Sequence, residues 1–148
     1  MNPEEELLLK LRAADAIIGF SPLEDEPDVH DFLVRHEIFK PGRSILADKH
    51  ISPHDFAASL GSAHGGEKIC ILIPGKRFDS FGTRHGRGGG WYDRFLSQVP
   101  REWLRVGVLH GHQLSAEKLV REPWDEPVDY LLIEKAGAWN IVLATSKN

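Results

Sequence analysis

The chain has 148 residues, of which 41% are hydrophobic and 27% are charged, as in an average soluble globular protein. These values exclude a disordered tail, a collagen-like repeat and a coiled coil. The length is that of one ordinary domain, so we expect residues 1–148 to form a single domain. With 18 Lys and Arg against 22 Asp and Glu, the formal net charge is -4, which disfavours nucleic-acid-binding proteins because they usually carry a basic excess.

The single cysteine, Cys70, cannot form an internal disulfide and lies in the apolar run Ile69–Ile73. We therefore expect a buried, unreactive thiol in a reducing compartment. The first residues, Met1–Glu6, are acidic where a targeting peptide would be basic. No apolar stretch approaches the ~20 residues of a membrane span, so we expect a cytoplasmic protein without membrane or nucleic-acid partners.

Apolar residues recur at steps of three and four from Leu7 to Ile18, which predicts a helix over Glu4–Ile18. Gly19 ends this pattern, and an acidic, proline-containing segment follows it. The elements expected next are an exposed loop over Leu23–Pro27, a short helix over Asp28–His36 and a short strand over Ser44–Ala47.

Ser52 and Pro53 predict the start of another helix, because serine is a good N-cap and proline suits the first helical position. This helix is expected to end at Gly65. The segment Lys68–Ile73 is then a continuous apolar run bounded by turn residues. Such a run is typical of a strand buried on both faces, as in a parallel sheet covered by helices.

The second half of the chain repeats the alternation of helices and strands. It predicts helices over Gly90–Gln98 and Ser115–Val120, and strands over Leu104–Leu109, Tyr130–Glu134 and Trp139–Ala144. Alternating strands and helices with short connections predict an α/β protein, a three-layer α/β/α sandwich around a mostly parallel sheet.

The segment Pro74–Arg94 carries most of the chemistry in the sequence. It begins at the carboxyl end of a predicted buried strand, the edge at which open α/β sheets bind ligands. Glycines crowd residues 86–90 and leave backbone N–H groups open to a ligand. Arg84 and Arg87 add planar donor groups that match phosphate oxygens. The segment therefore predicts a phosphate-binding loop.

The common nucleotide-binding motifs do not fit this loop. A dinucleotide-binding loop needs glycine where this chain has Trp91, and the Gly-Lys-Ser/Thr triplet of a P-loop is absent. Two alternatives remain for the residues alone. The glycines could form a simple hinge, or the segment could bind RNA with Trp91 and Tyr92 as stacking platforms, which the acidic chain disfavours.

The residues of this segment and the order of motifs after it resemble the 5-formyltetrahydrofolate cyclo-ligase family, also called methenyltetrahydrofolate synthetases. The resemblance covers the C-terminal half of the chain. It rests on Pro74-Gly75, Phe78-Asp79, Gly82, Arg84, Gly86, Gly88-Gly89-Gly90, Tyr92-Asp93-Arg94, Val106-Gly107, Gln113, Glu122-Pro123, Asp125, Pro127-Val128-Asp129 and Glu134.

The resemblance implies a cyclo-ligase-like fold of the NagB/CoA-transferase type. It also implies Mg-ATP-dependent closure of 5-formyltetrahydrofolate to 5,10-methenyltetrahydrofolate, with ATP phosphorylating the formyl oxygen before the neighbouring nitrogen attacks. ATP and Mg²⁺ are the implied cofactors, and a folate or a related compound is the implied substrate.

The implied site residues form three groups. Arg84 and Arg87 would be the catalytic cations, and Asp93 and Asp129 the magnesium carboxylates, directly or through water. By their positions alone, these two aspartates could instead be a helix first-turn acid and a turn residue before a strand. The nucleotide loop would comprise Arg84, Gly86, Arg87, Gly88, Gly89, Gly90, Trp91 and Tyr92, and the folate side Arg87, Gly88, Gly89, Gly90 and Trp91.

The sequence departs from the family pattern in several places. The segment before Pro74 is shorter than in the family, Trp91 stands where tyrosine or phenylalanine is usual, and His85 where an aliphatic residue is usual. The family also places basic residues of its first helix near ATP. Lys10 and Arg12 are candidates for that role, or for a solvated helix face.

His110 and His112 replace an aromatic-flanked tract of the family. Because positions two apart on a strand share a face, these histidines could ligate a metal together or have structural roles. We expect five other histidines to be surface residues and three tryptophans to be core or interface anchors. These are His30, His36, His50, His54 and His64, and Trp103, Trp124 and Trp139.

Two functions follow from this sequence. The first is an ATP-dependent cyclo-ligase acting on a folate or a related formyl or carboxyl compound. The second is a non-catalytic family member that kept the phosphate loop and binds a nucleotide, a phosphorylated metabolite or a protein partner. A second subunit completing the pocket would make the protein a homo-oligomer.

Overall fold

A six-stranded sheet runs through the computed structural model, which describes residues 1–38 and 40–145. The strand order is β2-β1-β3-β6-β7-β8. All neighbours pair in parallel except β7 and β8, which are antiparallel. The strands are β1 (Ala16–Gly19), β2 (Ser44–Leu46), β3 (Ile69–Ile73), β6 (Leu104–His110), β7 (Tyr130–Lys135) and β8 (Ala138–Leu143). The prediction of a mostly parallel sheet is therefore confirmed.

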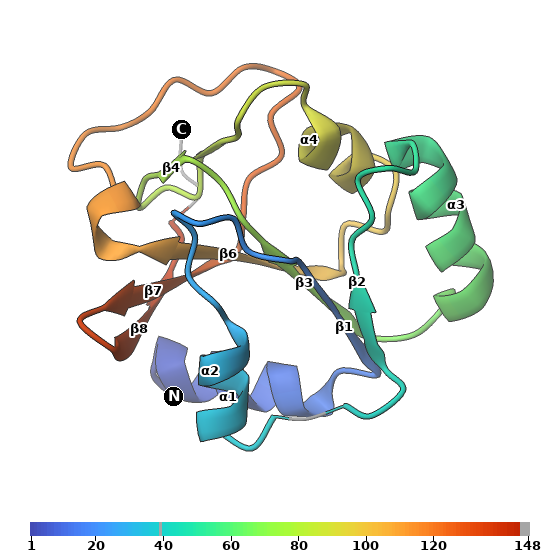
Figure 1. Cartoon of the computed structure of the whole chain (residues 1–148), viewed down its shortest axis with the longest axis horizontal. Coiled ribbons are helices and arrows are strands. Elements are labelled where there is room, and N and C mark those ends of the chain that lie inside the picture. Colours follow the sequence, from blue (N-terminus) through green and yellow to red (C-terminus); the bar gives the residue numbers. More distant parts are fainter. Residues whose placement is uncertain (39, 146–148) are drawn as a thin grey trace.

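Helices cover both faces of this sheet (Figure 1). In β3, Ile71 belongs to the cluster packed under α3 and α4, whereas Leu72 belongs to the cluster packed against α1 and α2. The helices are α1 (Pro3–Ala13), α2 (His30–Arg35), α3 (Pro53–His64) and α4 (Trp91–Leu96), with a short 3-10 helix η1 (Gly111–Gln113). This arrangement confirms the three-layer α/β/α sandwich.

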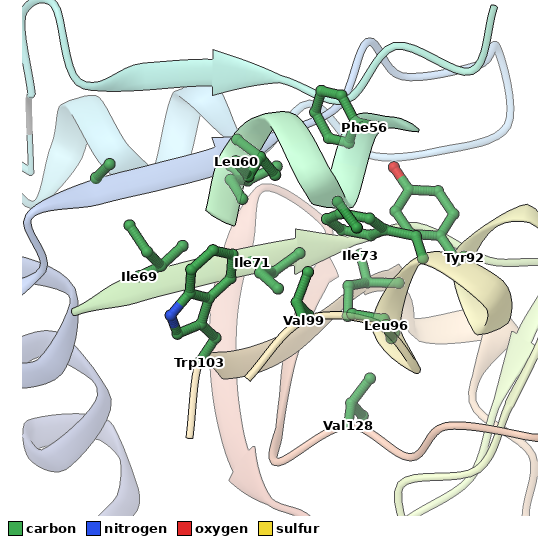
Figure 2. Packing of buried hydrophobic residues seen from close by; sticks show 14 of the residues in the cluster. Phe56, Leu60, Ile69, Ile71, Ile73, Tyr92, Leu96, Val99, Trp103 and Val128 are labelled. Carbon is green, nitrogen blue, oxygen red and sulfur yellow. The ribbon is translucent and has the colours of Figure 1, made fainter. Parts of the chain in front are cut away.

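Figure 2 shows how the α3 and α4 face is packed. Phe56 and Leu60 of α3 lie over Ile71 of β3, and Tyr92 and Leu96 of α4 close the cluster from the next helix. All five of these side chains are buried. The packing fixes α4, and with it the glycine-rich segment before it, at the carboxyl end of β3.

The starts of the two long helices agree with the sequence. The Ser52 side chain accepts a hydrogen bond from the Asp55 backbone N–H at 3.1 Å, and Pro53 is the first residue of α3. Asn2 caps α1 in the same way, through the N–H of Glu5 at 2.9 Å. Capping of this kind satisfies backbone donors that the helix itself leaves unpaired.

The prediction of one helix over Glu4–Ile18 is wrong, because α1 ends at Ala13 and Ala16–Gly19 forms β1. Asp15 lies at the junction, where its carboxylate accepts a hydrogen bond from the Lys68 N–H at 2.8 Å. The residues after it are buried on both faces of the sheet. An apolar run of this length fits a helical stripe and a buried strand equally well, and pairing with β2 and β3 decides for the strand.

The predicted helix over Ser115–Val120 is also absent. The backbone there pairs with distant groups instead: Ser115 N–H donates to the Phe78 carbonyl at 2.7 Å, and Leu119 N–H to the Asp79 carboxylate at 2.7 Å. The segment therefore crosses a small two-stranded ribbon made of β4 (Arg77–Phe78) and β5 (Arg84–His85). Long-range pairing has replaced the local helix.

Cys70 is buried in β3, as predicted, and burial raises the pKa of its thiol to about 12. Because the thiolate is the reactive form, we expect no reaction with a thiol reagent at pH 8 in the folded protein. In denaturant, one thiol per chain should react, which spectrophotometric thiol titration can measure. Stoichiometric labelling of the folded protein within minutes would contradict the packing of β3.

No helix among the described residues is long and apolar enough to cross a membrane.

Candidate active site

A cavity of about 650 Å³ opens at the carboxyl ends of β1, β2 and β3. This is the sheet edge at which the sequence predicted a ligand. Segments that are far apart in the sequence meet here. The lining residues are Phe20, Ser21, Leu23, Glu26, Leu46, Ala47, Asp48, Lys49, His50, Pro74, Gly75, Arg84, Gly86, Arg87, Gly88, Gly90, Trp91, Tyr92 and Asp93.

Arg84 is the most enclosed cation of this cavity. Its residue is only 8% exposed, its Nε donates to the Pro74 carbonyl at 2.6 Å, and its guanidinium lies 5.2 Å from the ring centre of Tyr92. Burial lowers the pKa of Arg84, and the nearby Asp93 opposes that shift. A guanidinium remains charged in proteins, so a positive charge in a poorly solvated position borders the cavity.

Two glycines make room for this side chain. A Cβ at Gly75 would lie 3.1 Å from Cγ of Arg84, and one at Gly86 would lie 2.9 Å from its Nη2. Both distances are shorter than ordinary contacts. These glycines therefore allow the backbone on either side to approach the guanidinium closely, which explains why they flank Arg84 in the motif.

The next three glycines form a turn that only glycine adopts easily. Gly88, Gly89 and Gly90 have φ values of +98°, +78° and +65°, and Gly90 is the N-cap of α4. Consecutive residues with positive φ would strain any other side chain. Gly88 and Gly90 line the cavity. The turn thus exposes peptide groups to the cavity beside Arg84 and Arg87.

Arg87 is held by two carboxylates from the segment after β1. Its Nη2 lies 2.9 Å from Asp25 Oδ1, its Nη1 donates to Asp25 Oδ2 at 3.0 Å, and its Nε donates to Glu26 at 3.1 Å. Burial lowers the pKa of Arg87, but the hydrogen bonds to Asp25 and Glu26 outweigh it and raise the pKa. The Arg87 hydrogen bond lowers the pKa of Asp25. The predicted phosphate ligand is therefore paired with carboxylates in this structure.

The predicted exposed loop over Leu23–Pro27 is only partly exposed. Glu26 and Pro27 are buried, and the Glu26 carboxylate also accepts the Leu23 N–H at 2.9 Å. The sequence missed this because the partner of Glu26 is Arg87, 61 positions away.

Aromatic side chains complete the wall next to the glycine turn. Trp91 stacks on Phe95 with ring centres 5.3 Å apart, and its indole N–H donates to the Ile51 carbonyl at 3.0 Å. Tyr92 is 2% exposed, and burial raises the pKa of its hydroxyl. Lys49 Nζ lies 5.8 Å from the Tyr92 ring centre, and both residues line the cavity. The cavity lining therefore includes both aromatic and cationic side chains.

Asp93 borders this cavity and a second one of about 510 Å³ that also includes Gly89, Trp124 and Glu126. One carboxylate oxygen, Oδ1, accepts the Glu126 N–H at 3.1 Å. Burial raises the pKa of Asp93, while the Glu126 N–H and Arg84 act in the opposite direction. A desolvated carboxylate at the junction of two cavities suits a hard cation.

Asp129 is not among the residues that line either cavity. Its Oδ1 accepts a hydrogen bond from Arg101 at 3.0 Å, and its Oδ2 accepts the Arg105 N–H at 2.9 Å. The structure thus does not bring Asp129 to the cavity wall with Asp93. Its contacts match the alternative interpretation, a turn residue before a strand.

The basic residues of the first helix lie away from the cavity lining. Lys10 Nζ is 3.3 Å from the Tyr130 hydroxyl and 3.6 Å from Glu6, and Arg12 donates to the His36 carbonyl at 3.1 Å. These contacts match the alternative of a helix face.

His110, the last residue of β6, and His112 of η1 stack on each other, with ring centres 5.4 Å apart. His110 is also 2.6 Å from Glu134. The hydrogen bond from Gly137 N–H and then that from His110 lower the pKa of Glu134. Within the described residues, no group of three or more His, Cys, Asp or Glu side chains is placed to hold a metal ion. The contacts of His110 are those of a structural residue.

The other aromatic and histidine predictions hold in part. Trp103 is 2% exposed in the core, and Trp139 packs against Phe32, but Trp124 is 66% exposed and is not a core residue. The five predicted surface histidines are exposed or half-buried.

Several motif residues position loops rather than line the cavity. Gln113 donates to the Gly75 carbonyl at 2.8 Å, which fixes the turn after β3. Asp79 is 1% exposed and accepts the N–H groups of Phe81 and Thr83, both at 3.0 Å. The motif therefore combines ligand-facing groups with groups that hold the loop.

The cavity also contains groups that were not predicted from the sequence. Lys49 and His50 follow β2, and Phe20, Leu23 and Leu46 form an apolar wall. A usable signal existed, because residues after the carboxyl ends of parallel strands meet at one edge. Applied to β1 and β2, that rule points to these segments.

Comparison with known proteins gives consistent results. A sequence model described as the 5-formyltetrahydrofolate cyclo-ligase family matches residues 60–134, half of the chain. The chain is 32% identical over 63 residues to a 5-formyltetrahydrofolate cyclo-ligase of Mycoplasma genitalium, covering 43% of this chain and 37% of that protein. It is 42% identical over 59 residues to that of Escherichia coli K12, covering 39% and 32%. These matches thus span about a third of the length of the curated relatives.

Similarity of fold extends further. The structure of Aquifex aeolicus 5,10-methenyltetrahydrofolate synthetase superimposes with a TM-score of 0.61 at 24% identity, covering 100% of this chain and 87% of that one. The segment before the glycine-rich loop therefore also shares the fold of the Aquifex aeolicus protein.

Proposed function

Because the chain belongs to the 5-formyltetrahydrofolate cyclo-ligase family, we propose that it uses Mg-ATP to convert 5-formyltetrahydrofolate to 5,10-methenyltetrahydrofolate. The observation that carries the proposal is the buried Arg84, set between Gly75 and Gly86 and beside the glycine turn. A cation held in this way is preorganised for the charge of a phosphoryl group in transfer.

The composition of the cavity supports a folate as the second substrate. A folate has a flat ring system at one end and carboxylates at the other. Phe20, Leu46 and Trp91 offer apolar surface, and Lys49 offers a cation in the same lining. Ligand sites commonly combine an apolar wall with a few polar groups in this way.

In the first proposed step, the formyl oxygen attacks the γ-phosphorus of ATP and ADP leaves. The bond between the γ-phosphorus and the bridging oxygen breaks as the new oxygen–phosphorus bond forms. Arg84 and Arg87 would neutralise charge on the phosphoryl oxygens, and the peptide groups of the glycine turn would add donors. Arg87 must exchange a carboxylate for phosphate to do so.

In the second proposed step, the neighbouring folate nitrogen attacks the activated formyl carbon. The carbon–oxygen bond then breaks, and the formyl oxygen leaves as part of inorganic phosphate, while the nitrogen loses its proton to solvent. The products are the methenyl folate, ADP and phosphate. Substrates that fill the cavity would limit the access of water to the phosphorylated intermediate.

Asp93 fits a magnesium ion, because it is a desolvated carboxylate with its Oδ1 held by the Glu126 N–H. Mg²⁺ commonly binds through one or two carboxylates together with substrate phosphates. Bound there, the ion would screen the phosphate charges and orient the γ-phosphoryl group. We assign Asp93 to the ion and leave Asp129 with Arg101 and Arg105.

The reaction also bears on where the protein works. We place it in the cytoplasm, where ATP is supplied and where the free thiol of Cys70 stays reduced.

The proposal is tested by mixing the purified protein with Mg-ATP and 5-formyltetrahydrofolate and following the absorbance of methenyltetrahydrofolate. We expect product only when both ATP and a divalent ion are present. Stabilisation by Mg-ATP without any product would contradict the ligase function and support a nucleotide-binding protein instead.

The contacts of Arg87 give a further prediction. Asp25→Asn removes a carboxylate that competes with phosphate for Arg87, while Glu26 remains on Nε. We expect Mg-ATP to bind about two- to fivefold more tightly, in line with the small energies of exposed ion pairs. Isothermal titration calorimetry measures the change.

Glu24→Gln is the matched control, because it removes the same charge from the exposed residue next to Asp25. We expect this variant to bind Mg-ATP like the wild type. Equal tightening in both variants would mean a general charge effect, and unchanged affinity in Asp25→Asn would mean that phosphate does not reach Arg87.

A further inference from the structure

Arg105 is a charged residue in the interior of the protein. It lies in β6 and is 1% exposed. Two of its guanidinium nitrogens, Nη1 and Nη2, each contact a different segment of the chain. Nη1 is 2.6 Å from Glu126 Oε1, and Nη2 donates to the carbonyl of Leu96, the last residue of α4, at 2.9 Å. Its buried Nε has no hydrogen-bond partner among the described residues.

The contacts of this residue lead directly to Asp93. The backbone N–H of Glu126, whose side chain pairs with Arg105, donates to Asp93 Oδ1 at 3.1 Å. Asp93 is in the first turn of α4 and Leu96 ends that helix. One guanidinium is therefore connected to both ends of α4, through Glu126 at one end and directly at the other.

Stability alone does not explain a buried arginine here. A buried ion pair recovers little or none of the cost of desolvating its charges, and apolar replacements of similar volume are often neutral or stabilising. The unpaired Nε adds to that cost. Leu109, two pairs of positions along the same strand and on the same face as Arg105, is fully buried, which shows that apolar side chains fill this face of β6. A residue that is unfavourable for stability at this place calls for another role.

We propose that the Arg105–Glu126 pair positions Asp93 for the divalent cation of the proposed reaction, on which this inference rests. With its side chain fixed by Arg105, Glu126 holds its backbone N–H against Oδ1 of Asp93, which leaves the other carboxylate oxygen, Oδ2, for the cation. Neither Arg105 nor Glu126 touches the reacting atoms. They are positioning residues, and partners of this kind around a metal ligand typically change metal affinity about 10–100-fold.

The test is the double variant Arg105→Met/Glu126→Leu, which removes both charges together and keeps the backbone N–H of residue 126. Binding of Mn²⁺ in the presence of ADP is measured by electron paramagnetic resonance, and binding of ADP alone is measured in EDTA. We expect a melting temperature equal to or above that of the wild type, Mn²⁺ affinity about 10–100-fold weaker, and unchanged affinity for metal-free ADP.

Arg43→Met is the matched control, since it removes an exposed arginine paired with Asp15 at 3.9 Å. It should bind Mn²⁺ like the wild type. If the double variant does not fold, Glu126→Gln replaces it, because this change keeps the shape and the backbone N–H. Mn²⁺ affinity should then fall at least several-fold with metal-free ADP affinity unchanged.

Wild-type Mn²⁺ affinity in a folded variant would overturn the positioning role and leave only a structural one. Equal losses of Mn²⁺ and metal-free ADP affinity would overturn it too, because they indicate a general distortion of α4. Since metal binding is measured without turnover, failure of the proposed reaction is seen separately. A wild type that binds Mn²⁺ but forms no product contradicts the ligase function alone.

Discussion

Replacing Arg84 by methionine should lower kcat/KM for methenyltetrahydrofolate formation by about 10²–10³-fold, the usual loss when a preorganised donor to a developing charge is removed. Arg84 is buried between two glycines and stacked on Tyr92. Methionine keeps much of the volume and adds no charge, so the melting temperature should change far less than the activity. Steady-state kinetics and thermal unfolding measure the two effects.

Arg77→Met is the control for this variant. Arg77 is an exposed arginine on β4, the strand that pairs with the strand of Arg84. In the part of the chain that the structure describes, Arg77 is not one of the residues that line the cavity. We expect activity close to that of the wild type. If Arg84→Met retained more than a third of wild-type kcat/KM, the phosphoryl group would have to bind elsewhere.

Gly82→Ala should give the largest loss of stability from a single methyl group. Gly82 has a φ of +89°, and a Cβ there would lie 2.6 Å from the backbone oxygen of Val128. Positive φ costs a non-glycine residue about 1–2 kcal/mol, and overpacking adds about 1–3 kcal/mol. We expect the free energy of unfolding to fall by about 2–5 kcal/mol, as measured by urea denaturation.

Gly61→Ala is the opposite case in the same protein. Gly61 lies inside α3, and a Cβ there would meet nothing within 4 Å. Alanine in a helix interior is favoured over glycine by about 0.5–1 kcal/mol, so this variant should be more stable than the wild type. Equal effects of the two substitutions would contradict the close contact between Gly82 and the Val128 backbone.

The fold could be predicted from the sequence where the signals were local. Ser52 and Pro53 mark the start of α3, and the apolar run before Pro74 marks β3. The errors arose where distant partners decide. Ala16–Gly19 became a strand because it pairs with β2 and β3, and Ser115 bonds to Phe78 instead of forming a helical turn. Local periodicity carries no information about such partners.

In the candidate site, too, local features could be predicted from the sequence and contacts between distant residues could not. Arg84 and the glycine turn were identified from their residue types and from their place after a buried strand. The carboxylates on Arg87 were not, because Asp25 and Glu26 come from a loop 62 and 61 positions away, respectively. The pairing of Arg105 with Glu126 was likewise invisible, since nothing in a strand pattern marks a buried charge and its partner.

An isotope measurement in a single turnover tests the proposed reaction most directly. The protein in excess is mixed with Mg-ATP and 5-formyltetrahydrofolate carrying ¹⁸O in the formyl group, and the phosphate released is analysed by mass spectrometry. Because the formyl oxygen leaves as part of phosphate, we predict one ¹⁸O atom in the phosphate for each methenyltetrahydrofolate formed. Unlabelled phosphate, or hydrolysis of ATP without methenyltetrahydrofolate, would contradict a phosphorylated formyl oxygen at this site.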